Sequence, residues 1–310
     1  MKRITNEIII DSLDKYVREI ETLSKKYFTE RSENETFCSQ TLLYRGQADK
    51  NWLLLPSIAR YKDSFSKLFF IERSIIEKAK NELPKIFGSF RSPIELLALL
   101  QHYGIPTRLL DVTENPLIAL FFACNCCDKS VGEVIAFKDE KTTTYNSFIQ
   151  ELIADTYNLF QKSYMTLNDI LDIAKSKNYC DDLIKIEQEM GNRSGTNTEV
   201  STIVDRCSKV NFVTASKFSD RQKVQASKYI LFNNAIHKAG EGNFKGKYFF
   251  ETYIDPLNKN SDEVICRFII PAENKKSIIQ LLSQFGVSEK MLFPEDVSSA
   301  CREVAREFGF

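Results

Sequence analysis

The chain has 310 residues, of which 43% are hydrophobic and 27% charged, a composition that excludes a disordered or collagen-like protein. The 42 Lys and Arg residues balance 42 Asp and Glu residues, whereas a dedicated DNA-binding protein usually carries a basic excess. The N-terminal residues have too short an apolar run and too many acids for a signal peptide, and no apolar run approaches the ~18 residues of a membrane span. We therefore expect a cytoplasmic protein with no membrane partner and with reduced thiols.

Helical spacing of apolar side chains predicts a first helix over residues 11–29 and a second over 66–83. Between them, residues 41–47 are typical of a short buried strand that runs into a glycine. These local patterns place the first polar motif of the chain at a strand end.

Two further helices have clear start signals. Ser92 caps the first of them, Pro93 occupies its first helical position, Glu95 completes a capping box and Gly104 ends it. The second begins after the cap Asn115, and its run of eight apolar residues predicts burial on nearly all sides. The polar segment between the two helices is expected to be a loop.

The second half of the chain is richer in β-branched and aromatic runs. Strands are expected at 132–139, 228–234, 247–255 and 263–271, helical structure at 144–190, a polar loop at 191–202, and closing helices at 273–285 and 294–308. Without a steady βαβ alternation, this order favours an α+β fold with a mixed or antiparallel sheet and flanking helices. We expect one domain over residues 1–310, with 140–200 as a helical insertion.

The cysteines Cys124, Cys126 and Cys127 form a local cluster near the end of one predicted helix. A zinc site needs four ligands, commonly in paired clusters, and the chain offers no second CxxC or HxxxH pair. We therefore expect no metal.

Four motifs in one order resemble the FRG domain family, named for its Phe/Tyr-Arg-Gly motif. They are LYRGQ (43–47), W-x-L-x-P-S-I-x-R ending at Arg60, LLQHYGIPTRLLDVTENPLIALFFA (99–123) and LFPEDVSSACREV (292–304). The resemblance spans roughly residues 5–306, with Val112 where the family has a tryptophan. It implies a bacterial toxin or phage-defence role, with an antitoxin or regulator as a candidate partner.

The first motif places a guanidinium, Arg45, at the end of a buried strand and beside a glycine. Guanidinium groups bind phosphates through two parallel hydrogen bonds, and the alternative is a structural pair with a carboxylate such as Asp111. His102 lies in the last turn of a helix, where it is either a general acid or base or a partner of a helix-end carbonyl.

The segment 106–116 follows, anchored by its leucines and ending at a helix N-terminus that favours anions. It is expected to line a pocket, and the alternative is a buried Arg–Asp network that fixes the shape of the loop. Further along, Arg221 and Gln225 match the family's R-x-x-x-Q stretch, with Gln225 as a reader of an amide or a ribose hydroxyl. The candidate ligand-binding residues are Tyr44, Arg45, Gly46, Gln47, Gln101, Thr107, Arg108, Thr113, Arg221 and Gln225; the candidate catalytic residues are His102, Asp111 and Glu114.

The YRG strand and the later glutamine also resemble arginine-type ADP-ribosyltransferases at the level of short motifs. This implies NAD as a substrate, held by the arginine, with a carboxylate that stabilises the oxocarbenium-like transition state and a protein or nucleic acid as acceptor. The carboxylate stays open among Asp111, Glu114, Glu199, Glu241 and Glu251.

We therefore expect an NAD-consuming enzyme, either an ADP-ribosyltransferase or an NAD glycohydrolase. The alternatives are a non-catalytic module that binds a nucleotide or a protein, and a metal-independent phosphodiesterase or nuclease with His102 as acid or base. Each of Arg45, His102, Arg108, Asp111 and Gln225 lies where a buried element meets a loop, and we expect these residues to converge on one concave site.

Overall fold

The computed structural model describes residues 6–32, 42–60, 68–88, 92–127, 129–139, 148–159, 165–166, 210–217, 219–233, 236–238, 248–250 and 253–294. Most of the expected insertion at 140–200, the loop at 191–202 and the closing helix beyond residue 294 lie outside these ranges. No helix among the described residues is long and apolar enough to cross a membrane.

Seven strands form one mixed sheet in the order β1-β10-β4-β2-β3-β7-β6. Their bounds are β1 Glu7–Ile9, β2 Leu42–Gln47, β3 Leu109–Thr113, β4 Gly132–Lys138, β6 Asn211–Val213, β7 Ser227–Leu231 and β10 Val264–Ile270. β1 runs parallel to β10, and all other neighbouring strands are antiparallel. A second sheet, in the order β5-β9-β8, is made of β5 Met165–Thr166, β8 Ile236–Lys238 and β9 Tyr248–Phe250. The expected α+β fold with a mixed sheet is confirmed.

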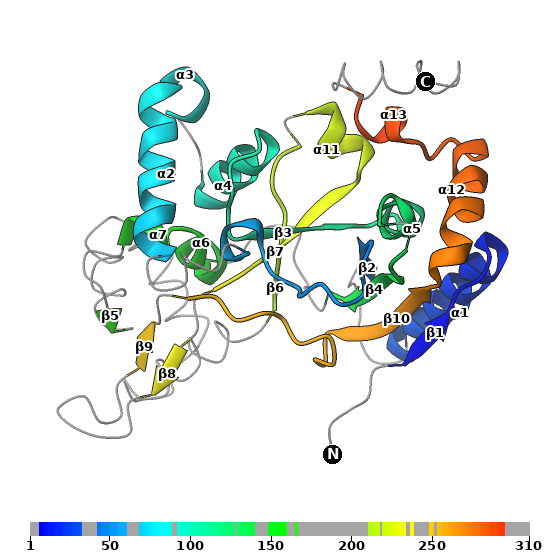
Figure 1. Cartoon of the computed structure of the whole chain (residues 1–310). Helices are drawn as coiled ribbons and strands as arrows, with labels where there is room; N and C mark the ends of the chain where they lie inside the picture. Colours follow the sequence, from blue (N-terminus) through cyan, green and yellow to red (C-terminus); the bar gives the residue numbers. More distant parts are fainter. Residues whose placement is uncertain are drawn as a thin grey trace.

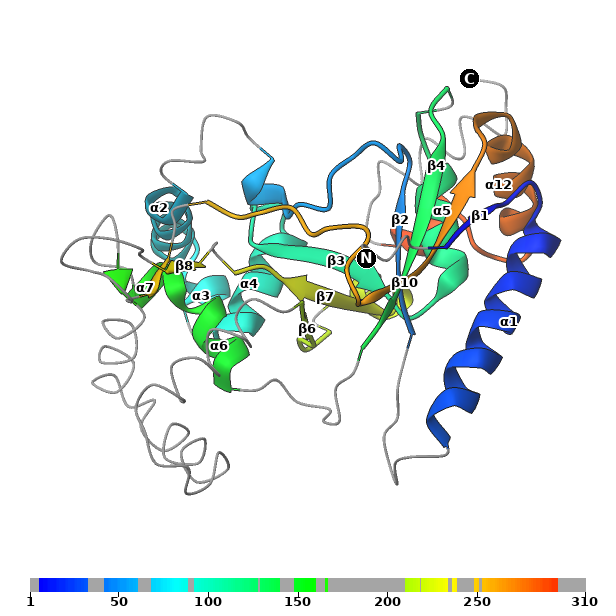
Figure 2. The same cartoon turned by 90° about the horizontal axis from the view of Figure 1, so that it is seen from below.

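The large sheet divides into two halves between β2 and β3. These strands share one paired position, Tyr44 opposite Thr113, whereas β2 and β4 pair over six positions. Beyond Tyr44 and Thr113 the two strands separate, and Figure 2 shows β2, β4 and β10 running across the direction of β3 and β7. The fold therefore opens a gap in its sheet where the YRG motif ends.

The helices flank both halves of the sheet (Figure 1). Their bounds are α1 Leu13–Ser32, α2 Leu68–Glu82, α3 Pro84–Phe87, α4 Pro93–His102, α5 Pro116–Cys124, α6 Phe148–Ala154, α7 Thr156–Leu159, α11 Asp220–Val224, α12 Lys275–Gln284 and α13 Glu289–Leu292, with short 3-10 turns at Ser57–Ala59 and Ala272–Asn274. α5 packs on β2 and β4 and is covered by α12, while α4 packs against α6 and β3.

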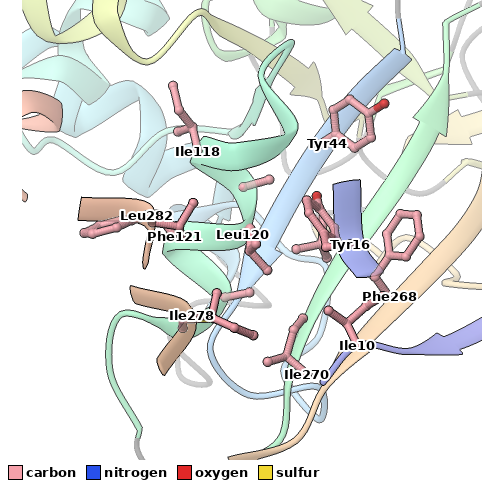
Figure 3. Close-up of a cluster of buried hydrophobic side chains, with 14 of the residues drawn as sticks. Ile10, Tyr16, Tyr44, Ile118, Leu120, Phe121, Phe268, Ile270, Ile278 and Leu282 are labelled. Carbon is pink, nitrogen blue, oxygen red and sulfur yellow. The ribbon is translucent and has the colours of Figure 1, made fainter. Parts of the chain in front are cut away.

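The first core cluster lies between α1, α5, α12 and the β1-β10-β4-β2 half of the sheet (Figure 3). Tyr16, Tyr44 and Phe268 are buried in it, with Ile118 and Ile278 from the covering helices. A second cluster combines the other face of this half-sheet with side chains from β3, β6 and β7, among them Leu110 and Ile230. The two halves are therefore joined by a shared core although the ladder between them is almost absent.

Gly46 has a packing reason to be glycine. A Cβ atom built there would lie 1.9 Å from the backbone oxygen of Ala119 and 2.8 Å from the nitrogen of Ala123. The glycine of the YRG motif thus lets α5 approach β2 backbone to backbone.

The predicted helix starts are found at α4 and α5. The Ser92 side chain accepts from the Glu95 nitrogen, and the Asn115 side chain accepts from the Leu117 nitrogen. In the predicted capping box, the Glu95 side chain would accept a hydrogen bond from the backbone nitrogen of Ser92. In the structure, the Glu95 carboxylate accepts a hydrogen bond from Ser216 Oγ. Gly104 follows the end of α4 with a φ of 83°.

The segment predicted as a loop between α4 and α5 is partly a strand. β3 lies inside the sheet between β2 and β7, and its side chains alternate across it. Leu110 and Val112 enter the second core cluster, while Asp111 between them is exposed. This alternation, rather than a loop conformation, decides where each polar side chain of the motif points.

Candidate functional site

A cleft of ≈ 300 Å³ opens where β2 and β3 separate. Its walls come from β2, β3, α5, the turn after β2, the loop after α5 and the segment from α11 to β7. Seven predicted site residues line it, namely Tyr44, Arg45, Gly46, Asp111, Thr113, Arg221 and Gln225. Residues more than a hundred positions apart in the chain therefore meet at one concavity.

Arg45 is half-buried and bridges the two strands that form the cleft. Its Nη1 donates a hydrogen bond to the backbone oxygen of Asp111 at 2.6 Å, where the β2–β3 ladder no longer continues. Its Nε is shielded from solvent and has no hydrogen-bond partner among the described residues. Burial lowers the pKa of the guanidinium to about 10, opposed by the nearby carboxylate of Asp111, so Arg45 is a cation at neutral pH. Arg45 thus combines a structural contact with a positive charge at the cleft, while its unpartnered Nε is buried.

The exposed carboxylate of Asp111 is held by a short chain of side-chain hydrogen bonds. Gln101 Nε2 donates to Asp111 Oδ1 at 2.8 Å, and Gln101 Oε1 accepts from Thr107 Oγ1 at 2.5 Å. Thr107 is itself buried, and its Oγ1 accepts from the Leu109 nitrogen at 3.2 Å. Gln101 and Thr107 do not line the cleft, but they fix the orientation of the carboxylate that lines it among the described residues.

The opposite wall is built from α11 and the turn after it. Ser219 caps α11 in a capping box with Gln222, whose side-chain amide donates to the Tyr229 hydroxyl at 3.0 Å. The exposed guanidinium of Arg221 lies over the ring of Phe293, 4.6 Å from its centroid. Arg221 is therefore a second cation at the cleft, oriented by an aromatic ring.

Gln225 lines the cleft, although part of its hydrogen-bonding capacity is already used. Its Nε2 donates to the backbone oxygen of Leu292 at 3.0 Å, and its backbone oxygen accepts from Thr113 Oγ1 at 2.7 Å. Thr113 Oγ1 also accepts from the Asn115 nitrogen at 3.0 Å. Gln225 and Thr113 thus tie β3, α11 and α13 together at the rim, with one amide N–H of Gln225 committed to structure.

Sequence reasoning assigned no role to several residues of the wall. Trp52 and Phe122 supply aromatic surface, and Asn125, Cys126 and Ser227 also line the cleft. Trp52 is the only tryptophan of the chain and is 47% exposed, which leaves its ring open to stacking. A single tryptophan soon after the predicted strand was the sign of this aromatic wall that the sequence offered. The sequence does not show where the ring of Trp52 points, because that depends on the turn after β2.

The structure places Arg108 away from the cleft, which corrects the expectation that it converges there with Arg45. Arg108 is fully buried and forms an ion pair with Glu72 of α2, through both Nε and Nη2. Arg108 directly precedes β3, and because side chains alternate along an extended chain, its guanidinium and the Asp111 carboxylate have different surroundings. The buried network considered in the sequence exists, but its acid is Glu72 rather than Asp111.

Three further candidates also lie outside the lining residues. The Nδ1 atom of His102 lies 3.4 Å from Ser219 Oγ, and Glu114 forms an ion pair with Lys228 at 2.9 Å. Gln47 is buried in β2 opposite Glu133. The expected convergence thus holds for Arg45, Asp111 and Gln225 and fails for His102 and Arg108. Glu199, Glu241 and Glu251 lie outside the described residues.

The chemistry available in the cleft follows from these groups. Two cations favour an anion such as a phosphate, and a carboxylate held by an amide stabilises positive charge on a reacting group. Aromatic rings offer a flat surface for a heterocycle. Among the described residues, no cluster of three or more Cys, His, Asp or Glu side chains is positioned to hold a metal ion.

Comparison with protein families matches residues 40–131 to the FRG domain. The match covers the LYRGQ motif, the segment ending at Arg60 and the long motif up to α5, and it confirms the resemblance for these three; the fourth motif, 292–304, lies outside the matched residues. The same comparisons found no match among curated proteins and none among solved structures.

Proposed function

We propose that this member of the FRG domain family binds NAD in the cleft between β2 and β3 and cleaves its nicotinamide–ribose bond, as an ADP-ribosyltransferase or an NAD glycohydrolase. The observation that carries the proposal is the meeting of Arg45 and Asp111 at one cleft. A fixed guanidinium and a fixed carboxylate are what this reaction needs for its phosphates and for its cationic transition state.

Arg45 is proposed to bind the pyrophosphate. Its Nη1 already bonds to the Asp111 backbone, so the group is held in place before a ligand arrives. Arg45 lines the cleft as a cation, and a charge-assisted bond to a phosphate oxygen is shorter and stronger than a neutral one. Arg221 adds a second cation at the rim.

The size of the cleft fits one end of a dinucleotide. At ≈ 300 Å³ it stands at the lower limit of ligand cavities, which range over about 300–1,000 Å³. We therefore place the nicotinamide riboside end inside, beside Trp52 and Phe122, and the adenosine end over the rim near Arg221.

Asp111 is proposed as the catalytic carboxylate. It is the acid that lines the cleft among the described residues, and Gln101 fixes one of its oxygens. Glu114 is a weaker candidate because its carboxylate is bound to Lys228. As the nicotinamide leaves, positive charge develops on the ribose, and a carboxylate oriented beforehand stabilises it without reorganisation.

The two alternative functions make different demands on the cleft. A non-catalytic nucleotide-binding module needs the same cations and rings but no acid in contact with the ribose. A metal-independent phosphodiesterase needs a general acid or base at the phosphate, and the His102 side chain does not line the cleft. We therefore favour NAD chemistry, keep the binding module as its alternative and rank the phosphodiesterase below both.

The biological role is part of the same proposal. The family resemblance favours a toxin or phage-defence effector that depletes NAD or modifies a protein or nucleic acid, under the control of an antitoxin or another regulator. Each of these roles requires the same chemistry of the cleft, namely binding of NAD and cleavage of its nicotinamide–ribose bond.

The test is incubation of the purified protein with NAD labelled in the nicotinamide ring, with and without cell lysate as acceptor. Release of free nicotinamide supports the enzyme. Calorimetric titration of NAD into the same preparation separates the alternatives, because binding without release in either condition would replace the enzyme with a binding module.

A further inference from the structure

Two adjacent cysteines lie at the edge of the cleft, directly after α5. Cys126 and Cys127 are both exposed and neither is in a disulfide. Their Sγ atoms are 3.5 Å apart, and Cys126 is one of the residues that line the cleft. The side chains of two neighbouring residues are thus turned to the same side.

A buried lysine holds the backbone of this pair. Lys275, at the start of α12, is 1% exposed, and its Nζ donates to the backbone oxygens of Cys126 and Cys127, each at 3.2 Å. The third bond of the ammonium goes to the oxygen of Ala48 at 2.6 Å, so the pair is tied to the chain that leaves β2. With both carbonyls drawn inward and φ angles of 144° and 53°, the loop presents both thiols outward.

We propose that Cys126 and Cys127 form a vicinal dithiol modification site, which exchanges with a small-molecule disulfide and closes into a disulfide between the two residues. One thiol loses its proton and attacks a sulfur of the reagent, which gives a mixed disulfide and releases the first reagent thiol. The second cysteine then loses its proton and attacks the protein-bound sulfur, which releases the other reagent thiol. The protein loses two hydrogen atoms, and the reagent disulfide is reduced to two thiols.

The neighbouring Cys124 takes no part in this exchange. It is 1% exposed within α5, and burial raises the pKa of its thiol to about 12, so almost none of it is thiolate at neutral pH. Exposure therefore separates the pair from the third cysteine of the same motif.

The closed form is expected to be readily reversible. Adjacent Cα atoms stand about 3.8 Å apart across a trans peptide, below the roughly 4.4–6.8 Å usual for disulfides. The strain makes the bond more reducible, as in labile and regulatory disulfides. Because Cys126 lines the cleft, closure also changes its wall; the proposal itself does not depend on which ligand the cleft binds.

The experiment uses the full-length protein and glutathione disulfide, followed by alkylation of free thiols, digestion with trypsin and mass spectrometry. Cleavage after Arg108 and Lys129 gives one peptide that contains Cys124, Cys126 and Cys127. We expect this peptide to lose two hydrogens, to retain one alkylated thiol at Cys124, and to regain the others after dithiothreitol.

Single variants make the result specific. Cys126→Ser and Cys127→Ser should each stop at a stable glutathione adduct, because the resolving thiol is gone, and Cys124→Ala should close like the wild type. The proposal is overturned if the wild-type peptide keeps three free thiols, if it accumulates the adduct without closing, or if Cys124→Ala no longer closes.

Discussion

Two arginines of the same family motifs, Arg45 and Arg108, have opposite surroundings. Arg108 is fully buried, and its charge is met by Glu72 of α2. Arg45 is half-buried at the cleft, bonds to a backbone oxygen and keeps an Nε without a partner among the described residues. The charge of Arg108 is paired inside the protein, whereas Arg45 carries its charge at the wall of the cleft.

The difference arises from the position of each residue relative to the break in the sheet. Arg108 precedes β3 and enters the helical layer of α2, α4 and α6, where a carboxylate is required to offset its desolvation. Arg45 lies one residue beyond the last β2–β3 pair, where strand separation removes ladder partners and opens the cleft. The interrupted ladder thus leaves a strand arginine at the wall of the cleft, where we propose that it binds a ligand, and the following variants test this contrast.

The largest effect is expected from the buried pair. Glu72→Gln removes the carboxylate charge that pairs with Arg108 in the core and should lower the free energy of unfolding by about 3–5 kcal/mol. Glu77→Gln on the same helix is the matched control, because Glu77 forms an exposed pair with Arg73, and should cost at most about 1 kcal/mol. Urea unfolding followed by circular dichroism measures both. Equal effects for the two variants would contradict a structural role for the Arg108 pair.

Asp111→Asn comes next and acts on turnover rather than on stability. The substitution keeps the shape and one acceptor for Gln101 but removes the charge, so nicotinamide release should fall by about 100-fold. The measurement requires protein shown to be folded by circular dichroism.

The matched control for Asp111→Asn is Glu114→Gln, since Glu114 is bound to Lys228 outside the cleft lining. It should retain near wild-type turnover. A folded Asp111→Asn protein with wild-type activity would remove Asp111 from the catalytic role, and a loss in Glu114→Gln alone would transfer that role.

Part of this site was readable from the sequence, because part of it is local. The caps Ser92 and Asn115 act on the next few residues, so their helices were predicted at the correct starts. The YRG strand was likewise predicted from a short run of neighbouring residues that ends at a glycine. The reason for Gly46 is not, since it depends on the approach of α5, more than seventy residues later.

The segment 106–116 shows where local reasoning ended. Its prolines, threonines and charged residues are typical of a loop, whereas pairing with β7, over a hundred residues away, makes Leu109–Thr113 a strand. Alternation of Leu110 and Val112 with Asp111 was the available signal for a strand. The partner of Arg108 lies on α2, thirty-six residues before it, and no spacing rule selects Glu72 from the other acids.

Arg45→Lys tests the other side of the comparison. Lysine keeps a charge but loses the planar set of donors, so the Kd for NAD should rise about tenfold, equivalent to about 1.4 kcal/mol, with little change in melting temperature. Arg108→Lys should do the reverse and lower the melting temperature while the folded protein binds NAD normally. Calorimetric titration and thermal unfolding of both variants measure the contrast. It fails if Arg45→Lys destabilises the fold as much as Arg108→Lys.

The smallest effect is expected for Gln101, which contacts the Asp111 carboxylate without lining the cleft. Gln101→Leu removes one exposed hydrogen bond to a group that keeps its charge. Its loss should cost about 1 kcal/mol, less than for a buried bond to a charged group, because water can replace the amide at the exposed carboxylate. We therefore expect kcat for nicotinamide release to fall about fivefold, with KM nearly unchanged, since the carboxylate is needed in the transition state.

If Gln101 only supports the fold, Gln101→Leu should lower activity to a similar degree in the wild-type protein and in the Asp111→Asn variant. If Gln101 acts by orienting Asp111, the substitution should have no further effect once Asp111→Asn has removed the charge, and the double variant should match Asp111→Asn alone. Thr107→Val offers a second check, because Thr107 Oγ1 donates to Gln101 Oε1 and its loss leaves the amide free to turn away from the carboxylate. Its effect on kcat should be no larger than that of Gln101→Leu and should also vanish in the Asp111→Asn background. Additive losses in either double variant would show that the Thr107–Gln101 chain supports the fold of this region rather than the orientation of the carboxylate.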